Sequence, residues 1–157
     1  ISVYIDPAYG SKQTDDPTAL LACYEQAGNF YIVRSEAVRY EFPDLMSYIQ
    51  VFCREVGCDH RSRIEVEPKA SGKSIVQVLK QQTGLNIVEG FNPTKDKTSR
   101  VQDISPIVEA GRVHLLRGAW NDAFLNECAS FPNGSNDDRV DTLVMALNPY
   151  KSNFFAI

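Results

Sequence analysis

Ile1-Ser2-Val3-Tyr4-Ile5-Asp6 opens the chain, and this stretch decides which fold class the sequence predicts. Its alternating pattern and its β-branched residues predict a strand that ends at a carboxylate. A loop of Pro, Gly, Ser and Asp residues follows over 7–17. Two more strand-like segments, 18–25 and 30–40, are separated by the turn signal Ala27-Gly28-Asn29. The first three strands are therefore predicted to form an antiparallel meander.

The periodicity then changes from that of strands to that of helices. Leu45, Ile49, Phe52 and Val56 recur at spacings of four, three and four, which predicts a helix from about residue 43 to Gly57. Further strands are predicted over 63–67, 85–88 and 113–116, and further helices over 75–82, 98–110, 120–130 and 137–147. A meander followed by α/β crossovers predicts an α/β fold, a mixed sheet with helices on its faces.

Two details of the predicted helices can be checked against a structure. Ser71 is expected to cap the helix over 75–82. Pro106 is expected to kink the helix over 98–110.

Length and composition limit the class of protein. A chain of 157 residues with 43% hydrophobic residues predicts one domain with its own core, which we place at 1–150 with a tail over 151–157. The 16 basic and 20 acidic residues give a net charge of −4, which argues against a generic basic DNA-coating protein. The longest apolar runs, 19–24 and 143–147, are too short to span a membrane. The chain lacks an initiator Met, so we expect it to be part of a longer protein.

Five acidic residues stand where a site is expected to form. Asp6 and Glu67 end predicted strands, and Asp137, Asp138 and Asp141 open the last predicted helix. Sites in open α/β sheets form beyond strand ends. Clustered carboxylates repel one another, and hard divalent cations such as Mg²⁺ and Mn²⁺ remove that penalty. The alternative for each acid taken singly is a solvated strand end or a helix cap.

Four sequence blocks bear a family resemblance when taken together. They are Ile5-Asp6-Pro7-Ala8-Tyr9-Gly10 with Asp15-Asp16-Pro17-Thr18-Ala19; Val66-Glu67-Pro68-Lys69-Ala70-Ser71-Gly72; Lys97-Thr98-Ser99-Arg100 with Glu109-Ala110-Gly111-Arg112-Val113; and Trp120, Phe124 and Leu125 with Phe131-Pro132-Asn133-Gly134, Asp137-Asp138 and Asp141. In order and spacing, over about residues 1–147, the chain resembles the nuclease domain of the viral (tailed-phage) terminase large subunit, in the RNase H-like superfamily.

The resemblance implies a fold, an activity and site residues. The fold would be an RNase H-like five-stranded mixed sheet of order 3-2-1-4-5 with strand 2 antiparallel, with room for one extra short strand. The activity would be a two-metal, Mg²⁺- or Mn²⁺-dependent endonuclease that cuts concatemeric double-stranded viral DNA during packaging. Asp6 would bridge the metal ions and Glu67 would be the second ligand. The third ligand maps to the Asp137-Asp138 pair, where we favour Asp138, with Asp141 as a further candidate.

The same resemblance implies partners and a location. An ATPase motor domain would precede this domain in the full-length chain, and the small terminase subunit and the portal protein would act with it. The setting would be the cytoplasm of the bacterial host. No membrane partner is implied, and the isolated domain is expected to be a monomer.

Basic residues follow two of the acidic blocks. Lys69, Lys73, Lys97 and Arg100 are candidates for contacts with DNA phosphates, which would depend on salt and not on base sequence. The alternative is a solvated charged face.

Other motifs are weaker. Gly72-Lys73-Ser74 resembles the end of a phosphate-binding P-loop, but Glu67 stands where the pattern needs its first Gly. Cys53, Cys58 and His60 lack a fourth zinc ligand at suitable spacing, so the four cysteines are expected to be reduced thiols. The rival functions are another RNase H-like nuclease, such as a Holliday-junction resolvase, and a non-catalytic RNase H-like binding module.

Overall fold

The computed structural model describes residues 1–8 and 15–150, so part of the predicted loop, 9–14, and the predicted tail, 151–157, lie outside the described residues. The elements alternate as the sequence predicts. They are β1 (Ser2–Asp6), β2 (Thr18–Gln26), β3 (Asn29–Val38), α1 (Phe42–Glu55), β4 (Arg63–Val66), α2 (Ala70–Gln82), β5 (Asn86–Glu89), α3 (Lys97–Glu109), β6 (Val113–Leu115), α4 (Asn121–Ser130) and α5 (Asp138–Leu147).

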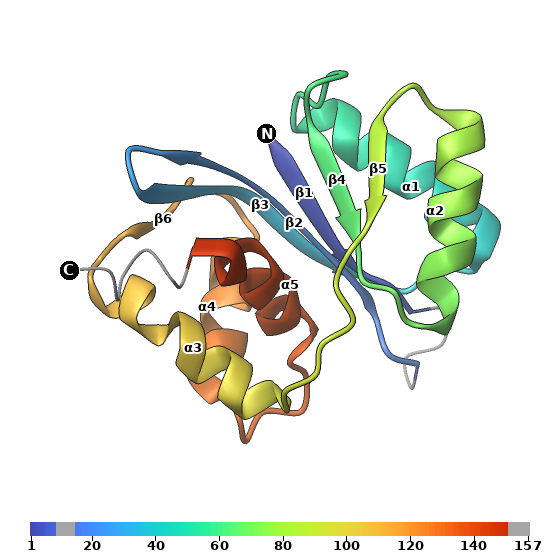
Figure 1. The fold of residues 1–157 in the computed structure, drawn as a ribbon. Helices are drawn as coiled ribbons and strands as arrows, with labels where there is room; N and C mark the ends of the chain where they lie inside the picture. The colour runs from blue at the N-terminus through green and yellow to red at the C-terminus, as the bar shows by residue number, and fades with distance from the viewer. Residues whose placement is uncertain (9–14, 151–157) are drawn as a thin grey trace.

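The strands form a mixed sheet of order β5-β4-β1-β2-β3-β6 (Figure 1). β2 is antiparallel to both β1 and β3, whereas β4 is parallel to β1 and to β5. This arrangement confirms the predicted order 3-2-1-4-5. The extra short strand is β6, which pairs parallel to the outer edge of β3.

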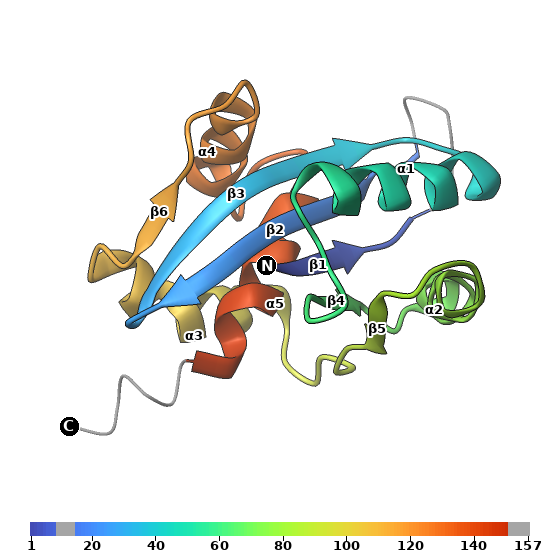
Figure 2. The ribbon, with the colours of Figure 1, turned by 90° about the horizontal axis from the view of Figure 1, so that it is seen from above.

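Helices cover both faces of the sheet. α1 and α2 lie on one face, and α3, α4 and α5 lie on the other (Figures 1 and 2). Successive residues of β1 serve both faces: Val3 and Ile5 join the core under α1 and α2, and Tyr4 joins the core under α5. A strand covered on both faces has no polar side, which explains why β1 is apolar from Val3 to Ile5.

α1 buries three residues of the predicted stripe, and the fourth, Val56, is the half-buried C-cap residue. Leu45, Ile49 and Phe52 are all buried against the sheet, which confirms the helical period read from the sequence. α3 contains Pro106 without ending there.

The start of α2 was predicted wrongly. The helix begins at Ala70, and its N-cap residue is Lys69, whose side chain makes no capping hydrogen bond; Ser71 lies within the first turn. The backbone turns directly after β4, where the Lys69 N–H donates to the Glu67 carbonyl at 2.9 Å and the Gly72 N–H donates to the Lys69 carbonyl at 2.8 Å. Gly72, which has no Cβ, fits against the Glu67 carbonyl in this turn, and the helix begins within it.

α5 carries three of the predicted site residues to the sheet. Its apolar side, including Val140, Leu143, Val144 and Leu147, packs across β1 and β2. Asp137 is the N-cap residue, and its side chain makes no capping hydrogen bond. The position of Asp137 is therefore not explained by side-chain capping.

Candidate functional site

The site is centred on two strand ends. β1 and β4 are parallel neighbours, and the Glu67 N–H donates to the Ile5 carbonyl at 2.9 Å, which extends their ladder one residue past β4. Asp6 and Glu67 therefore lie side by side at the carboxyl edge of the sheet. Each is only 3% exposed, and their carboxyl groups hydrogen-bond each other.

Two buried carboxyl groups in contact cannot both carry a full charge at low cost. Burial, followed by the hydrogen bond with Glu67, raises the pKa of Asp6 far above its ordinary range. Burial alone would raise the pKa of Glu67 as well, but the contacts with Asp6 and Lys69 bring it below its usual value. At neutral pH the Asp6 carboxyl is thus the proton donor and Glu67 the charged acceptor.

Lys69 joins this pair from the start of α2. Its Nζ lies 2.8 Å from Asp6 Oδ1 and 2.9 Å from Glu67 Oε2. The carboxylates raise the pKa of Lys69, although burial opposes the shift. Lys69 is a predicted DNA contact, and the structure places its ammonium on the predicted metal ligands.

A second acidic group lies on α5, facing α3. Asp141 is 2% exposed, and Lys97 Nζ lies 2.5 Å from Asp141 Oδ2 and 2.6 Å from Asp137 Oδ1. Arg100 Nη2 lies 3.4 Å from Asp141 Oδ1. Burial raises the pKa of Asp141 even though Lys97 opposes that shift.

Asp138, the favoured third ligand, is half-buried at the first residue of α5. Burial is the main cause that raises the pKa of Asp138 to about 6, followed by the charges of Glu127 and Asp137. Glu127 is held close by Arg139, whose backbone N–H and Nη1 donate to it at 2.6 and 2.9 Å. This ion pair, in which Glu127 is buried and Arg139 half-buried, fixes the start of α5 on α4.

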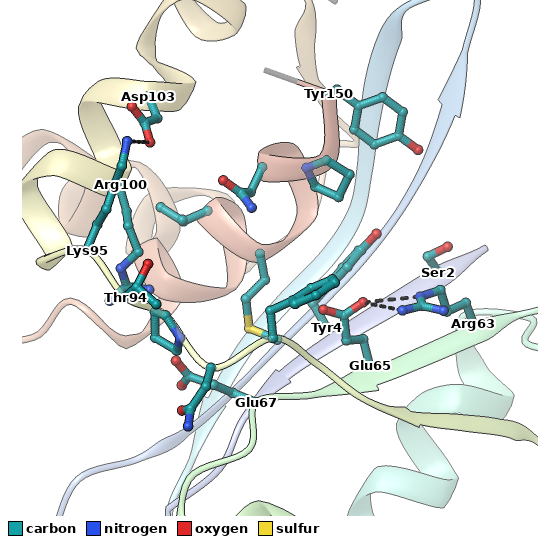
Figure 3. Close-up of a pocket in the computed structure, with 17 residues that line it drawn as sticks. Ser2, Tyr4, Arg63, Glu65, Glu67, Thr94, Lys95, Arg100, Asp103 and Tyr150 are labelled. Carbon is teal, nitrogen blue, oxygen red and sulfur yellow. Dashed lines mark hydrogen bonds and ion pairs between the residues drawn. The ribbon is translucent and has the colours of Figure 1, made fainter. Parts of the chain in front are cut away.

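Each acidic group also feels a basic residue that belongs to the other group. The Arg100 charge lowers the pKa of Glu67, and the Lys69 charge lowers that of Asp141. Glu67 and Arg100 also line one cavity of about 630 Å³ beneath the segment that joins β5 to α3 (Figure 3). Other cations of this cavity are paired within it, Arg63 with Glu65 and Lys95 with Asp103.

The predicted ligands are not gathered into a single coordination set. Among the residues that the structure describes, no three His, Cys, Asp or Glu side chains form a group that could hold a metal ion. Lys69 contacts both Asp6 and Glu67, and Lys97 contacts both Asp137 and Asp141. A basic side chain therefore bridges each pair of acids. The placement of basic side chains between the acids was not predicted, although Lys69 follows Glu67 by only two residues in the sequence.

The donor set nevertheless fits a hard divalent cation. In the described part of the chain, two buried carboxylate oxygens, Glu67 Oε2 and Asp141 Oδ1, have cationic neighbours but no hydrogen bond of good geometry. Buried carboxylate oxygens with spare lone pairs are the ligands that Mg²⁺ and Mn²⁺ prefer.

The weaker motifs have structural explanations. A Cβ built on Gly72 would lie 2.0 Å from the Glu67 carbonyl oxygen, so close backbone packing accounts for this glycine without a bound phosphate. Lys73 is exposed on α2. All four cysteines are free thiols, as predicted, and the Cys53 and Cys58 thiols hydrogen-bond each other.

Comparison with known families gives a match to the terminase RNaseH-like domain over residues 3–149. The chain belongs to this family. The match spans the meander, the α/β crossovers and every acidic position discussed above, and it confirms the resemblance drawn from the four sequence blocks. Comparison with curated protein sequences gives no significant match.

Solved structures show the same fold at low sequence identity. The Mn-soaked, inhibitor-bound nuclease domain of human cytomegalovirus terminase aligns with a TM-score of 0.68 at 15% identity, covering 92% of this chain and 80% of that one. The large terminase nuclease from thermophilic phage G20c gives 0.65 at 17% identity, with 95% and 81% covered. Fowlpox virus resolvase in complex with Holliday junction DNA gives 0.59 at 11% identity, with 97% and 99% covered.

The terminase domain thus has an RNase H-like fold with a buried acidic site at its sheet edge. In its described residues, no helix has the length and apolar character needed to cross a bilayer.

Proposed function

We propose that this terminase domain is a Mg²⁺- or Mn²⁺-dependent endonuclease that cuts concatemeric double-stranded viral DNA. The observation that carries the proposal is the direct contact between the buried carboxyl groups of Asp6 and Glu67 at the ends of parallel strands. Burying two such groups together is unfavourable for the fold, and a divalent cation turns that arrangement into a binding site. Membership of the terminase family and the Mn-soaked cytomegalovirus relative support this reading.

The proposed ligands come from the two strand ends and from the start of α5. Asp6 would be shared between two ions and Glu67 would be the second ligand. Asp138 remains the proposed third ligand, and Asp137 and Asp141 are the further candidates on the same helix. When bound, such ions activate a water molecule and stabilise the leaving oxygen of a phosphodiester. The protein side chains would hold the ions and orient the DNA, so no side-chain nucleophile is needed.

Basic side chains beside the acids would bind the DNA backbone. Lys97 and Arg100 lie at the start of α3, next to Asp141, and Lys73 is exposed on α2 near the end of β4. Lys69 lies on the carboxylates themselves. Phosphate contacts of this kind position a duplex without reading its sequence, so we propose little sequence preference for cleavage.

The wider setting is also part of the proposal. An ATPase motor domain in the same full-length chain would move the DNA, with the small terminase subunit and the portal protein as partners in the cytoplasm of a bacterial host. The isolated domain would be monomeric.

A substrate comparison tests the proposal against its nearest rival. Purified domain is incubated with linear duplex DNA and with a four-way junction of matched sequence, in Mn²⁺, Mg²⁺ or EDTA. We expect metal-dependent cleavage of the duplex at least as fast as cleavage of the junction. Strong preference for the junction would favour a resolvase, which the fowlpox resemblance makes the specific alternative. Absence of both cleavage and metal-induced stabilisation would favour a non-catalytic binding module.

A further inference from the structure

We propose that Lys69 competes with the divalent cation for Asp6 and Glu67, and that on metal binding its ammonium turns to a phosphate of the bound DNA. Lys69 is thus a positioning residue with two alternative partners. This inference rests on the proposed function and goes beyond it, because it assigns the control of metal affinity to a residue that is not a ligand.

The contacts of Lys69 set up the competition. Its Nζ lies 2.8 Å from Asp6 Oδ1 and 2.9 Å from Glu67 Oε2, so one ammonium bridges both carboxyl groups. These are the oxygens that would bind a metal ion. An ammonium and a divalent cation cannot both remain in contact with the same oxygens, because like charges a few ångströms apart repel strongly in a buried site. Metal binding therefore requires the ammonium to leave.

The local structure lets the side chain move while the backbone stays in place. The Lys69 N–H donates to the Glu67 carbonyl at 2.9 Å, and its own carbonyl accepts from the Gly72 N–H at 2.8 Å. The Lys69 side chain is 52% exposed, whereas those of Asp6 and Glu67 are each 4% exposed. The ammonium thus reaches the acids from the solvent side, the side from which a polymeric substrate must approach. A flexible four-carbon stem allows the exchange without unfolding α2.

The released ammonium has a ready partner in the substrate. A phosphate held at the site would bring negative oxygens within reach of the Lys69 side chain, and Lys is a strong donor to phosphate. One positive charge would then neutralise the acids before metal binds and the DNA backbone afterwards. Metal loading and DNA binding are coupled in this scheme through a single residue.

Calorimetric titration of Mn²⁺ into EDTA-treated and dialysed protein, without DNA, tests whether Lys69 competes with the metal ion. Lys69→Met keeps the length of the side chain and removes its charge. Lys80→Met removes an equal charge from an exposed position near the end of α2 and is the matched control. We expect Lys69→Met to bind Mn²⁺ about tenfold more tightly than wild type. Loss of the ammonium removes a repulsion that is larger for a divalent ion than for a proton on the same carboxylates, so metal binding improves more than protonation does. Lys80→Met should bind as wild type does.

Fluorescence anisotropy of duplex DNA, with Ca²⁺ to limit cleavage, tests whether Lys69 contacts a phosphate of the bound DNA. The slope of log affinity against log salt should fall by about one in Lys69→Met. Unchanged or weaker Mn²⁺ binding by Lys69→Met overturns the competition, and an unchanged salt slope overturns the phosphate contact. If neither wild type nor variant binds Mn²⁺, the proposed function itself fails. Lys69→Gln, with folding checked by circular dichroism, replaces the Met variant if that variant misfolds.

Discussion

Asp6 and Glu67 lie at the ends of neighbouring parallel strands, and their buried carboxyl groups share a hydrogen bond. The register that joins Glu67 to the Ile5 carbonyl makes this contact a direct consequence of the sheet topology. The contact is costly in a domain without a counter-charge, and Lys69 supplies one. The two acids are thus held together by a shared proton and the Lys69 ammonium.

Replacement of Asp6 separates stability from metal binding. Because the raised pKa of Asp6 keeps it protonated at neutral pH, the neutral and equally sized Asn is a close substitute in the absence of metal. We expect Asp6→Asn to melt within a few degrees of wild type in EDTA and to lose the rise in melting temperature caused by Mn²⁺. Thermal denaturation of both proteins with and without Mn²⁺ checks this. A full Mn²⁺ response in the variant would remove Asp6 from the ligand set.

The acids predict how stability depends on pH. The pKa of Asp138 is raised to about 6 and that of Asp6 is raised further, so the folded state binds protons that the unfolded state releases. The stability contributed by these two groups is full below their unfolded pKa values and is lost as the pH rises through the folded ones. The pKa of Glu67 is lowered, so the stability that Glu67 contributes is lost as the pH falls, in solution more acidic than this range.

Without metal, we therefore expect the free energy of unfolding to fall between about pH 5 and about pH 8, and to fall less in Asp6→Asn. Since metal binding needs deprotonated ligands, the stabilisation by Mn²⁺ should grow over the same range. Urea denaturation at several pH values measures both effects. An apoprotein that becomes more stable as the pH rises through this range would contradict the protonated Asp6.

Close packing at Gly72 offers a steric test of the site. A Cβ there would lie 2.0 Å from the Glu67 carbonyl oxygen, whereas a Cβ at Gly84 would meet no atom within 4 Å. Gly72→Ala should cost about 1–3 kcal/mol of stability and displace Glu67, which weakens Mn²⁺ binding. Gly84→Ala should change stability by less than about 1 kcal/mol and leave Mn²⁺ binding unchanged. Equal stability and equal Mn²⁺ binding of the two variants would show that the backbone at the start of α2 shifts to accept a Cβ at residue 72.

The ion pair between Glu127 and Arg139 is predicted to hold the start of α5 in place. Glu127→Gln leaves the half-buried Arg139 guanidinium without its counter-charge and should destabilise the domain by about 2 kcal/mol. Glu109→Gln, at an exposed position on α3, is the control and should have little effect. Chemical denaturation compares them. If both variants were equally stable, the ion pair would contribute nothing measurable.

Much of the fold could be predicted from the sequence because its signals are local and consistent. The strand pattern of residues 1–6 and the stripe of Leu45, Ile49 and Phe52 each identify one element, and the four family blocks imply the sheet order. The start of α2 was missed because Ser71 is a favourable capping residue by local rules, whereas the tight turn that brings Gly72 against the Glu67 carbonyl starts the helix at Ala70 without a capping side chain.

The site was only partly predictable. The placement of Asp6 and Glu67 follows from strand ends, which a sequence reveals. The pairing of Lys97 with Asp141 joins residues 44 positions apart and depends on how α3 packs against α5, which no local pattern specifies. Basic residues near acids in a sequence suggest DNA contacts, and only the fold shows that Lys69, Lys97 and Arg100 also neutralise the acids.

Cleavage of supercoiled plasmid DNA tests the central claim most directly. Wild type and Asp6→Asn are compared side by side in Mn²⁺, Mg²⁺ and EDTA. We predict nicked and linear products from wild type with Mn²⁺ or Mg²⁺, none with EDTA, and none from the folded variant under any condition. Equal cleavage by the folded Asp6→Asn variant, or cleavage by wild type that persists in EDTA, would contradict the assignment of a metal-dependent nuclease site to Asp6 and Glu67.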